Sequence, residues 1–502
     1  MTTFSDKARL LLESGLFDEH WYVERYPDVL RAGMSPAEHF VRIGQHLGRT
    51  PRKGGNVVAA STFLTASRAR TAADAISDDL RKKASTFHLF DAAWYRAHHA
   101  HDAGDDADLL IDYLKRSATD PRIDPGPLFS TSYYAAKHGD SVSMAPLIHA
   151  CQYGFAEGRP VFAPQKVDTY LTENRDVQGC EIAQLIDRSK PVHIVYWSEG
   201  NFFFTEMAHY LRTVLSDAGY DVTCEPDLSD ARADNIVVVA PHEFCIHGPG
   251  KRWKQQWLSQ AVYLNTEQWH TQWFSLAFRY LTLSNKAIDM NPASAAGLQR
   301  LGVRTVFLPI LPTVGSPFDT GRVAISDEFS NSRYILDLCY PDEFSARPYD
   351  VLFVGAANSR REAALALLAP VLADHDSFLH CPRFSGPVRQ GDPDMMPTSD
   401  FVQIARNSKI LLNIHQGESR YFEWHRLFLF GIMEGCVVLT EPCIPNRFVE
   451  AGRDYLECDL DAMPERLHWL LEDPDGQAEM RRVRANCGQL RQRMWGWSGL
   501  RA

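Results

Sequence analysis

The chain has 502 residues, of which 45% are apolar and 23% are charged, and its formal net charge is −11. This composition indicates a globular protein of about three domains. The net negative charge excludes a broad nucleic-acid-binding or anionic-membrane-binding surface.

The first 22 residues lack the basic and apolar segments of a signal peptide. No apolar run approaches the ~18 residues of a membrane-spanning helix. The ten cysteines show no paired metal-finger spacing, which favours buried, reduced thiols. We therefore expect a cytoplasmic protein, with peripheral association at the inner membrane face as an alternative.

Residues 1–163 contain a degenerate repeat, with copies that begin at Leu16–Tyr22, Leu89–Tyr95 and Leu128–Tyr134. In each copy a phenylalanine precedes an aromatic pair by four and five positions, the spacing of one apolar helix face. An Ala/Arg/Ser-rich insert at 53–83 separates the first two copies. A single helical hairpin cannot bury its own face, so copies must stack on each other or on another domain. We expect an all-α helical repeat region that serves docking, oligomerisation or capping of a neighbouring domain.

After a connector at 164–190, apolar runs of strand length alternate with helical patterns. Runs that lack alternation are typical of strands buried on both faces, in parallel sheets with helices on both sides. In the first series the strands are predicted at 193–197, 235–240, 261–264 and 304–308; in the second, at 351–354, 377–379, 409–414, 437–439 and 454–456. The predicted fold is α/β, with two Rossmann-like doubly wound domains at 191–315 and 350–475. A linker at 316–349 joins them, and a C-terminal helix at 476–502 packs back on the first.

The stretch from Lys409 to Glu441 reads as strand, polar loop, helix, small turn and strand. Its order, ending in Gly-Cys-Val-Val-Leu-Thr-Glu, resembles the nucleotide-sugar-binding half of GT-B glycosyltransferases. The resemblance covers roughly Pro191 to Met494. It implies a nucleotide-diphosphate sugar donor in the second domain and an acceptor in the first. The N-terminal copies resemble a short aromatic repeat found beside bacterial polysaccharide and glycosyltransferase domains.

A turn of small residues at Gly355 follows a strand and opens a helix, and it contains Asn358, Arg360 and Arg361. Small residues allow close backbone approach, and the helix N-terminus with two arginines suits a diphosphate. The turn is neither a Walker loop nor GxGxxG. The alternative is an ordinary turn with solvated arginines.

The loop after the 409–414 strand offers further donor contacts. We expect Glu418 and Glu423 to bind ribose hydroxyls, Arg420 and Arg426 the diphosphate, and His415 the sugar or a phosphate. Thr440 and Glu441 follow the next strand. In similar enzymes the turn at this place faces the donor sugar or diphosphate, so we expect these two residues to contact the donor. The loop departs from the E-x7-E pattern of many retaining GT-B enzymes, so inversion and retention stay open. The alternative is a solvated loop with surface ion pairs.

An inverting enzyme needs a general base in the first domain. The strand ends there offer Glu199, His242 and Glu267 as catalytic candidates. We favour His242 and Glu267, because burial at a strand tip raises a carboxyl pKa and favours neutral imidazole. Aromatic residues near these turns either stack on a sugar or lipid-linked acceptor or form domain core.

The sequence thus predicts a glycosyltransferase that moves a sugar from a nucleotide diphosphate to a glycan, lipid-linked or protein acceptor, in bacterial surface polysaccharide or glycoprotein synthesis. We expect no nucleic-acid partner and no cofactor. We also expect no metal, because Asp392-Pro393-Asp394 reads as a solvated turn. The alternatives are a non-catalytic scaffold, favoured by the missing paired glutamates, and a GT-B-like epimerase or phosphorylase.

Overall fold

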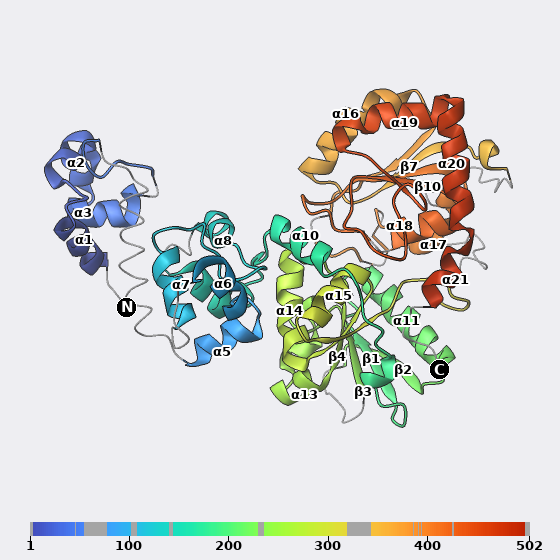
Figure 1. The fold of residues 1–502 in the computed structure, drawn as a ribbon, viewed down its shortest axis with the longest axis horizontal. Helices are drawn as coiled ribbons and strands as arrows, with labels where there is room; N and C mark the ends of the chain where they lie inside the picture. Colours follow the sequence, from blue (N-terminus) through green and yellow to red (C-terminus); the bar gives the residue numbers. More distant parts are fainter. Residues whose placement is uncertain are drawn as a thin grey trace. The chain divides into compact units, whose positions relative to one another are not determined.

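The computed structural model describes residues 4–45, 47–54, 78–101, 108–139, 144–228, 235–318, 343–384, 386–389, 391–392, 394–423 and 426–496. The chain forms two compact units. The first comprises Met1–Glu157 and Val161–Lys166, and the second Gly158–Pro160 and Val167–Ala502. Figure 1 colours the elements along the chain.

Within its described residues the first unit contains helices and no strand. Its helical elements are α1 (Phe4–Glu13), α2 (Glu19–Arg25), η1 (Pro27–Arg31), α3 (Pro36–His39), η2 (Phe40–Gly44), α5 (Asp78–Thr86), α6 (Ala92–His99), α7 (Leu109–Ser117), α8 (Thr131–Lys137), α9 (Pro146–His149) and η4 (Ala150–Gly154). Most of the predicted insert at 53–83 lies outside the described residues.

The first and third predicted copies contain the same buried contact. The Tyr22 hydroxyl lies 3.3 Å from His39 Nδ1, and the Tyr134 hydroxyl lies 2.9 Å from His149 Nδ1. In the first copy a Cβ on Gly44 would collide with the Tyr22 hydroxyl. A glycine therefore lets the second helix of the hairpin approach the tyrosine closely.

The three copies also begin their first helix in the same way. The side chains of Asp18, Asp91 and Ser130 each accept the backbone N–H three residues ahead, which caps α2, α6 and α8. In the second copy the partner of the buried tyrosine is different, because the Tyr95 hydroxyl donates to Asp112. The local sequence therefore sets the helix starts, and the partner of the tyrosine varies.

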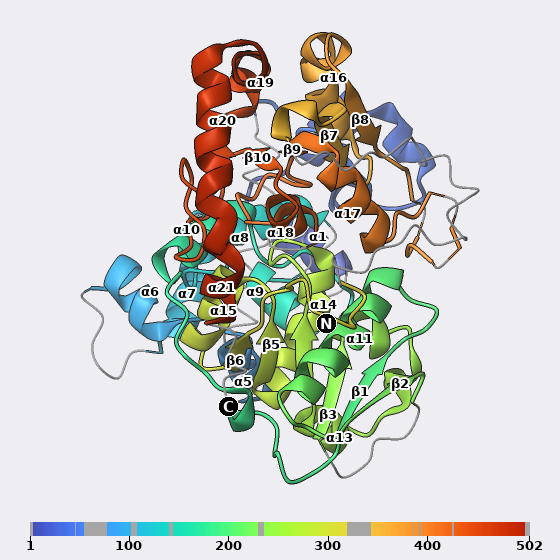
Figure 2. The ribbon, with the colours of Figure 1, turned by 90° about the vertical axis from the view of Figure 1, so that its right-hand side faces the viewer.

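The second unit contains two parallel sheets (Figures 1 and 2). The first sheet has the order β2-β1-β3-β4-β5-β6, and with its helices we call it the first lobe. Its elements are β1 (Val192–Tyr196), α11 (Phe202–Asp217), β2 (Val222–Pro226), β3 (Asn235–Val239), α12 (Pro241–Phe244), η6 (Pro249–Arg252), α13 (Gln255–Gln260), β4 (Val262–Asn265), α14 (Gln272–Ser284), β5 (Lys286–Asp289), α15 (Pro292–Arg300) and β6 (Arg304–Phe307). Before them come α10 (Pro164–Glu173) and η5 (Ile182–Gln184).

Two strands of the first lobe were not predicted. β2 forms the edge of the sheet, and its sequence Val-Thr-Cys-Glu-Pro is half-buried rather than continuously apolar. β5 reads Lys-Ala-Ile-Asp, in which only two apolar residues separate two charges. Both strands form because neighbouring strands pair with them, a tertiary effect that a short local pattern does not reveal.

The second sheet has the order β11-β10-β9-β7-β8, and with its helices it forms the second lobe. Its elements are η8 (Phe344–Ala346), β7 (Tyr349–Val354), α16 (Ser359–Ala373), β8 (Ser377–His380), α17 (Thr398–Arg406), β9 (Ser408–Asn413), α18 (Arg426–Met433), β10 (Val437–Thr440), β11 (Leu456–Glu457), η9 (Leu460–Ala462), α19 (Met463–Glu472), α20 (Pro474–Asn486), η10 (Cys487–Gln489) and α21 (Leu490–Trp495).

Alternate residues of the second sheet belong to two different cores. Leu352, Leu411 and Val438 share a buried cluster with residues of α17, α18 and the first lobe. Their strand neighbours Val351 and Ile410 belong to a second cluster with α16, α19 and α20. Figures 1 and 2 show α17 and α18 on the side of this sheet that faces the first lobe. Helices therefore cover both faces of this sheet, and the predicted α/β fold of two doubly wound domains is confirmed.

The C-terminal helix predicted at 476–502 is divided in the structure, where α20 ends at Asn486 and α21 covers Leu490–Trp495. Asp473 and Pro474 separate α19 from α20, because Pro474 starts a new helix that the Asp473 side chain caps. Leu490 and Met494 of α21 belong to the buried cluster that contains residues of both sheets. The last part of the predicted helix, at 497–502, lies outside the described residues.

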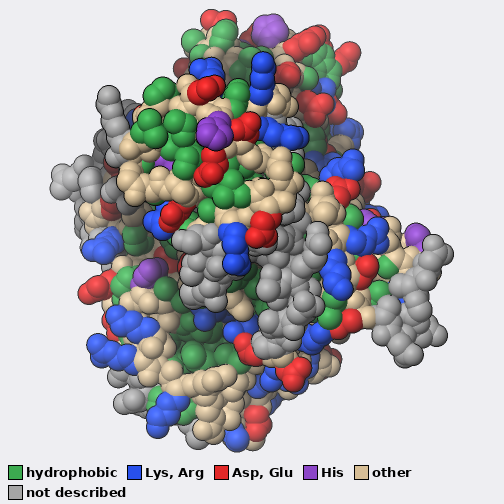
Figure 3. Space-filling model, turned by 90° about the vertical axis from the view of Figure 1, so that its left-hand side faces the viewer, with side chains coloured by type: hydrophobic (Ala, Val, Ile, Leu, Met, Phe, Trp, Pro, Cys, Tyr) green, Lys and Arg blue, Asp and Glu red, His purple; other side chains and the backbone are tan. Residues whose placement is uncertain are grey.

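Over the described residues, no helix combines the length and apolar character that crossing a bilayer requires. Positive and negative side chains are intermixed on the face of the molecule drawn in Figure 3. Such a surface is typical of a chain whose charged residues are mostly solvated.

Candidate functional site

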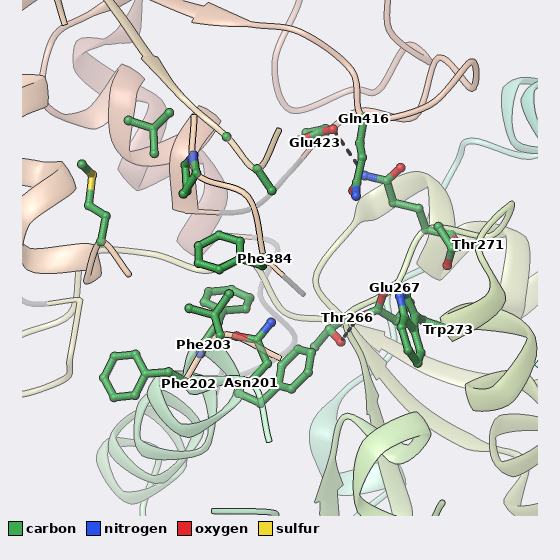
Figure 4. A pocket seen from close by; sticks show the side chains of 18 of the residues that line it. Asn201, Phe202, Phe203, Thr266, Glu267, Thr271, Trp273, Phe384, Gln416 and Glu423 are labelled. Atoms are coloured by element: carbon green, nitrogen blue, oxygen red, sulfur yellow. Dashed lines mark hydrogen bonds between the residues drawn. The ribbon is translucent and has the colours of Figure 1, made fainter. Parts of the chain in front are cut away.

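A cavity of about 470 Å³ lies between the carboxyl ends of the two sheets. Its volume falls in the range of small-molecule sites, and parallel sheets place ligands at this end of their strands. The first lobe contributes Asn201, Phe202, Phe203, Phe204, Thr266, Glu267, Gln268, Thr271, Gln272, Trp273, Met290 and Asn291. The second contributes Val354, Gly355, Ala356, Arg361, His380, Pro382, Phe384, Val388, Asp394, Met395, Met396, Gln416, Tyr421 and Glu423. Figure 4 shows side chains of the two lobes approaching this cavity from opposite sides.

Glu267 is the carboxyl group of the first-lobe wall, and 16% of its side chain is exposed. It follows β4, where Asn265 Oδ1 accepts the Glu267 N–H at 3.2 Å and Asn265 Nδ2 donates to the Glu267 carbonyl at 3.2 Å. Thr266 Oγ1 donates to the carboxylate at 2.9 Å, as Figure 4 shows. Burial raises the pKa of Glu267 to about 7. The side chain is therefore held firmly and is suited to exchange a proton near neutral pH.

His242 lies behind Glu267. Ala240, just after β3, adopts the left-handed conformation with φ 50°, a sparsely populated region for alanine. The turn places His242 Nε2 3.5 Å from Glu267 Oε1. Burial lowers the pKa of His242 to about 3, so the imidazole is neutral. Its Nδ1 is buried and has no hydrogen-bond partner among the residues that the structure describes. A neutral ring that donates through Nε2 can orient Glu267 without neutralising its charge.

A buried network beneath Glu267 fixes the turn that carries it. Asp289, at the end of β5, accepts from Asn265 Nδ2 at 2.8 Å, Ser294 Oγ at 2.6 Å and the Asn291 N–H at 2.8 Å. Burial raises the pKa of Asp289 to about 7. Asn291 in turn donates to the Phe422 carbonyl of the second lobe at 2.7 Å. Asp289 and Asn291 were not anticipated from the sequence, because β5, which ends at Asp289, was not predicted.

Glu199, the third predicted base candidate, is exposed and does not line the cavity. The turn after β3 instead brings Glu243 near the site, since Glu243 Oε2 accepts the N–H of Asn201, a cavity residue, at 2.8 Å. Burial raises the pKa of Glu243. The structure therefore brings Glu267 and His242 together and leaves Glu199 in solvent.

The predicted turn before α16 lies on the second-lobe wall, where Gly355, Ala356 and Arg361 line the cavity. Asn358 caps the helix by accepting the Arg361 N–H at 2.8 Å, and its Nδ2 donates to the Gln416 carbonyl at 3.0 Å. The helix N-terminus beside the cavity supplies backbone donors and a partial positive charge.

Arg361 is almost fully buried and holds the neighbouring loop. Its Nε donates to the Ile414 carbonyl at 3.0 Å and its Nη1 to the Ala356 carbonyl at 3.2 Å. Its Nη2 lies 3.6 Å from Glu423 Oε1, and both side chains are less than a tenth exposed. This guanidinium therefore joins the α16 turn to the loop after β9 and places a cation at the cavity wall.

Arg360, His415 and Glu441 form a connected group beside that wall but do not line the cavity. Arg360 Nη1 donates to Glu441 Oε2 at 2.9 Å and to the His415 carbonyl at 2.9 Å. The His415 N–H donates to Glu441 at 2.8 Å, and His415 Nε2 lies 3.2 Å from the Pro442 carbonyl. Burial acts to raise the pKa of Glu441, but the bonds from Arg360 and His415 lower it below its ordinary value. These predicted donor residues contact each other in the structure.

The structure does not bring the other predicted donor residues to the cavity. Glu418 and Arg420 are exposed. Thr440 is fully buried and accepts from Asn413 Nδ2 at 3.0 Å. Arg426 begins α18, and its side chain lies outside the described part of the chain. The loop turns Glu423 inward instead, where Gln268 Nε2 lies 3.4 Å from its carboxylate.

Several cavity residues were not anticipated from the sequence, among them Gln416, Tyr421, His380 and Phe384. Gln416 and Tyr421 lie within the predicted donor loop, so the location of the loop was a usable signal. His380 ends β8 and Phe384 follows it, and this strand end showed no concentration of charged residues. Phe384 and Gln416 gave no sequence signal, because a single aromatic or amide residue does not by itself indicate a binding site.

No protein-family model matches the chain, and no curated protein sequence matches it. Solved structures of similar fold include a DNA-modifying β-glucosyltransferase studied with and without uridine diphosphoglucose. It is 12% identical, the match covers 61% of this chain and 97% of that one, and the TM-score is 0.37. Anabaena HepE in complex with UDP-glucose is 10% identical over 61% of this chain and 98% of that one, with a TM-score of 0.33.

An α1,3-fucosyltransferase with GDP is 10% identical over 63% of this chain and 87% of that one, with a TM-score of 0.33. At such identities a shared function does not follow from a similar fold.

Proposed function

We propose that the chain is a glycosyltransferase that takes a sugar from a nucleotide diphosphate and transfers it with inversion. The observation that carries this proposal is one cavity that joins Glu267 on the first lobe to the start of α16 on the second. The Glu267 carboxyl group, which can accept a proton, thus faces a wall with backbone N–H donors and Arg361. A displacement at an anomeric carbon requires both, a base for the attacking hydroxyl and positive groups for the leaving diphosphate.

In the proposed reaction the acceptor hydroxyl approaches Glu267, and its oxygen attacks the anomeric carbon. The Glu267 carboxylate takes the hydroxyl proton as the new carbon–oxygen bond forms. The bond between the anomeric carbon and the diphosphate oxygen breaks, and the diphosphate leaves with the bonding electron pair. The N-terminus of α16 and Arg361 stabilise the charge that develops on it, so the proposed chemistry uses protein donors rather than a metal ion.

Glu267 suits the role of base better than the other candidates. Its pKa of about 7 lets it be ionised at neutral pH and still be basic enough to accept a proton. His242, whose pKa is lowered to about 3, is too weak a base, and we assign it the orientation of Glu267. The acceptor would be a glycan, lipid-linked or protein hydroxyl that reaches the first-lobe wall.

The proposal is tested by thermal denaturation with ADP, CDP, GDP, dTDP and UDP, because any ligand of the native state stabilises it. We expect one of these to raise the melting temperature, and the matching sugar nucleotide to be hydrolysed slowly to sugar and nucleoside diphosphate. Failure of the whole panel would disprove donor binding. Binding without turnover would indicate a scaffold, and release of an epimerised free sugar would indicate an epimerase.

A further inference from the structure

Asp168 lies outside both sheets and contacts the loop that follows β9. One carboxylate oxygen accepts the Ser419 hydroxyl at 2.6 Å, and the other accepts the Arg420 N–H at 2.9 Å. Ser419 is only 2% exposed, and the Asp168 side chain is 14% exposed. Hydrogen bonds to an ionised carboxylate are stronger than those between neutral groups, and Asp168 makes two of them where little solvent reaches.

The helix that carries Asp168 is fixed to the first lobe. In α10 the Tyr170 hydroxyl donates to the Gly297 carbonyl of α15 at 3.1 Å, and its ring lies 5.7 Å from that of Trp269. Leu171 packs so closely that a Cβ on Gly297 would lie 2.6 Å from it. Asp168 is therefore a first-lobe group, held in place by a packed helix, that bonds to a loop of the second lobe.

The loop that Asp168 holds forms part of the cavity wall. Gln416, Tyr421 and Glu423 line the cavity on either side of Ser419. The loop also approaches the first lobe at Gly417, where a Cβ would lie 2.8 Å from His270 Nε2. A shift at the centre of this loop would move both of its cavity-lining ends.

We propose that Asp168 is a positioning residue that seats the 414–423 loop against the first lobe and thereby sets the affinity for the donor. This inference rests on the proposed function. Asp168 does not line the cavity, so it acts through the loop and touches no reacting atom. It should therefore affect donor binding strongly and leave the ionisation of Glu267, and hence the pH dependence of transfer, unchanged.

The test compares Asp168→Ala, Ser419→Ala and the double variant, with Glu173→Gln as the matched control, because Glu173 is an exposed acid on the same helix. Calorimetric titration uses whichever diphosphate of the panel binds the parent chain. We expect Asp168→Ala to weaken binding about tenfold, Ser419→Ala to weaken it less, and the double variant to equal Asp168→Ala. The control should match the parent, and the pH midpoint of the transfer rate should stay the same in all variants.

Hydrogen exchange of residues 415–423 gives a second readout that needs no ligand. Asp168→Ala should speed exchange there, and Glu173→Gln should not. An Asp168→Ala variant with parental affinity, or additive losses in the double variant, would overturn the inference. Unchanged exchange in that loop would overturn it as well. If no diphosphate binds the parent chain, the proposed function fails first, and exchange alone then decides whether Asp168 orders the loop.

Discussion

The two walls of the cavity hold their charges in opposite ways. On and beside the second-lobe wall, the Arg360–Glu441 and Arg361–Glu423 pairs hold opposite charges within 4 Å of each other. On the first lobe Glu267 has a neutral imidazole, a hydroxyl and aromatic side chains around it. Pairing keeps a group ionised, whereas isolation raises a carboxyl pKa. The second wall is therefore built to hold a fixed charge pattern and the first to exchange a proton.

The largest expected effect comes from removing the isolated carboxyl. Glu267→Gln keeps the size and the hydrogen bonds of the side chain but cannot accept a proton. We expect transfer to fall by about 10²- to 10⁴-fold with unchanged diphosphate affinity, measured by initial rates and by titration. Glu199→Gln, an exposed acid of the same lobe, should retain parental rates. Equal losses in both variants would disprove the assignment of the base.

The second prediction tests the Arg361–Glu423 ion pair of the second-lobe wall. Arg361→Met removes a buried guanidinium and deprives Glu423 of its cation. Breaking such a pair should lower the free energy of unfolding by about 3–5 kcal/mol, measured by denaturant titration at pH 7. Adding Glu423→Gln should restore part of the loss, because it removes the uncompensated charge. If the double variant is no more stable than the single one, the pair is not the reason for the loss.

The third effect is the pH dependence of the proposed reaction. A base with a pKa of about 7 is fully ionised only above that pH, so the transfer rate should rise through neutrality and level off at alkaline pH. Two pH units below the midpoint the rate should be about a hundredfold lower than at the plateau. Initial rates at saturating donor between pH 5 and 9 measure this. A midpoint near the ordinary glutamate value of 4.5 would show that Glu267 is not isolated.

The smallest effect is on stability. The pKa of Glu267 is raised from 4.5 to about 7 by burial, so its folded state prefers the protonated form. Its stabilising contribution is present below pH 4.5 and is lost as pH rises through about 7. Glu267→Gln abolishes this loss, and we expect it to gain about 1–3 kcal/mol relative to the parent at pH 8 compared with pH 4.5. Denaturant titrations of both proteins at the two pH values measure the difference, and a parallel response of the two would contradict it.

Much of the architecture could be predicted from local sequence. Runs such as Asn235–Ala240 and Lys409–Ile414 are apolar without alternation, which is the pattern of strands buried on both faces, and both form central strands of parallel sheets. The turn at Gly355 also follows from its composition, and it lines the cavity. Strands β2 and β5 escaped prediction because their pairing, rather than their own residues, makes them strands.

By itself the sequence determined most of the strands and helices and several strand ends, among them those at Glu267 and Gly355, where polar residues follow buried strands. Local spacing is enough for this, because the period of apolar residues reports secondary structure directly. Only the tertiary structure decided which charges are paired and which are isolated. It turned Glu199 outward and Glu267 inward, joined Arg360 to Glu441, and brought Asp168 to a loop some 250 positions away. Those outcomes depend on burial and on contacts between distant segments, and no local pattern encodes either of them.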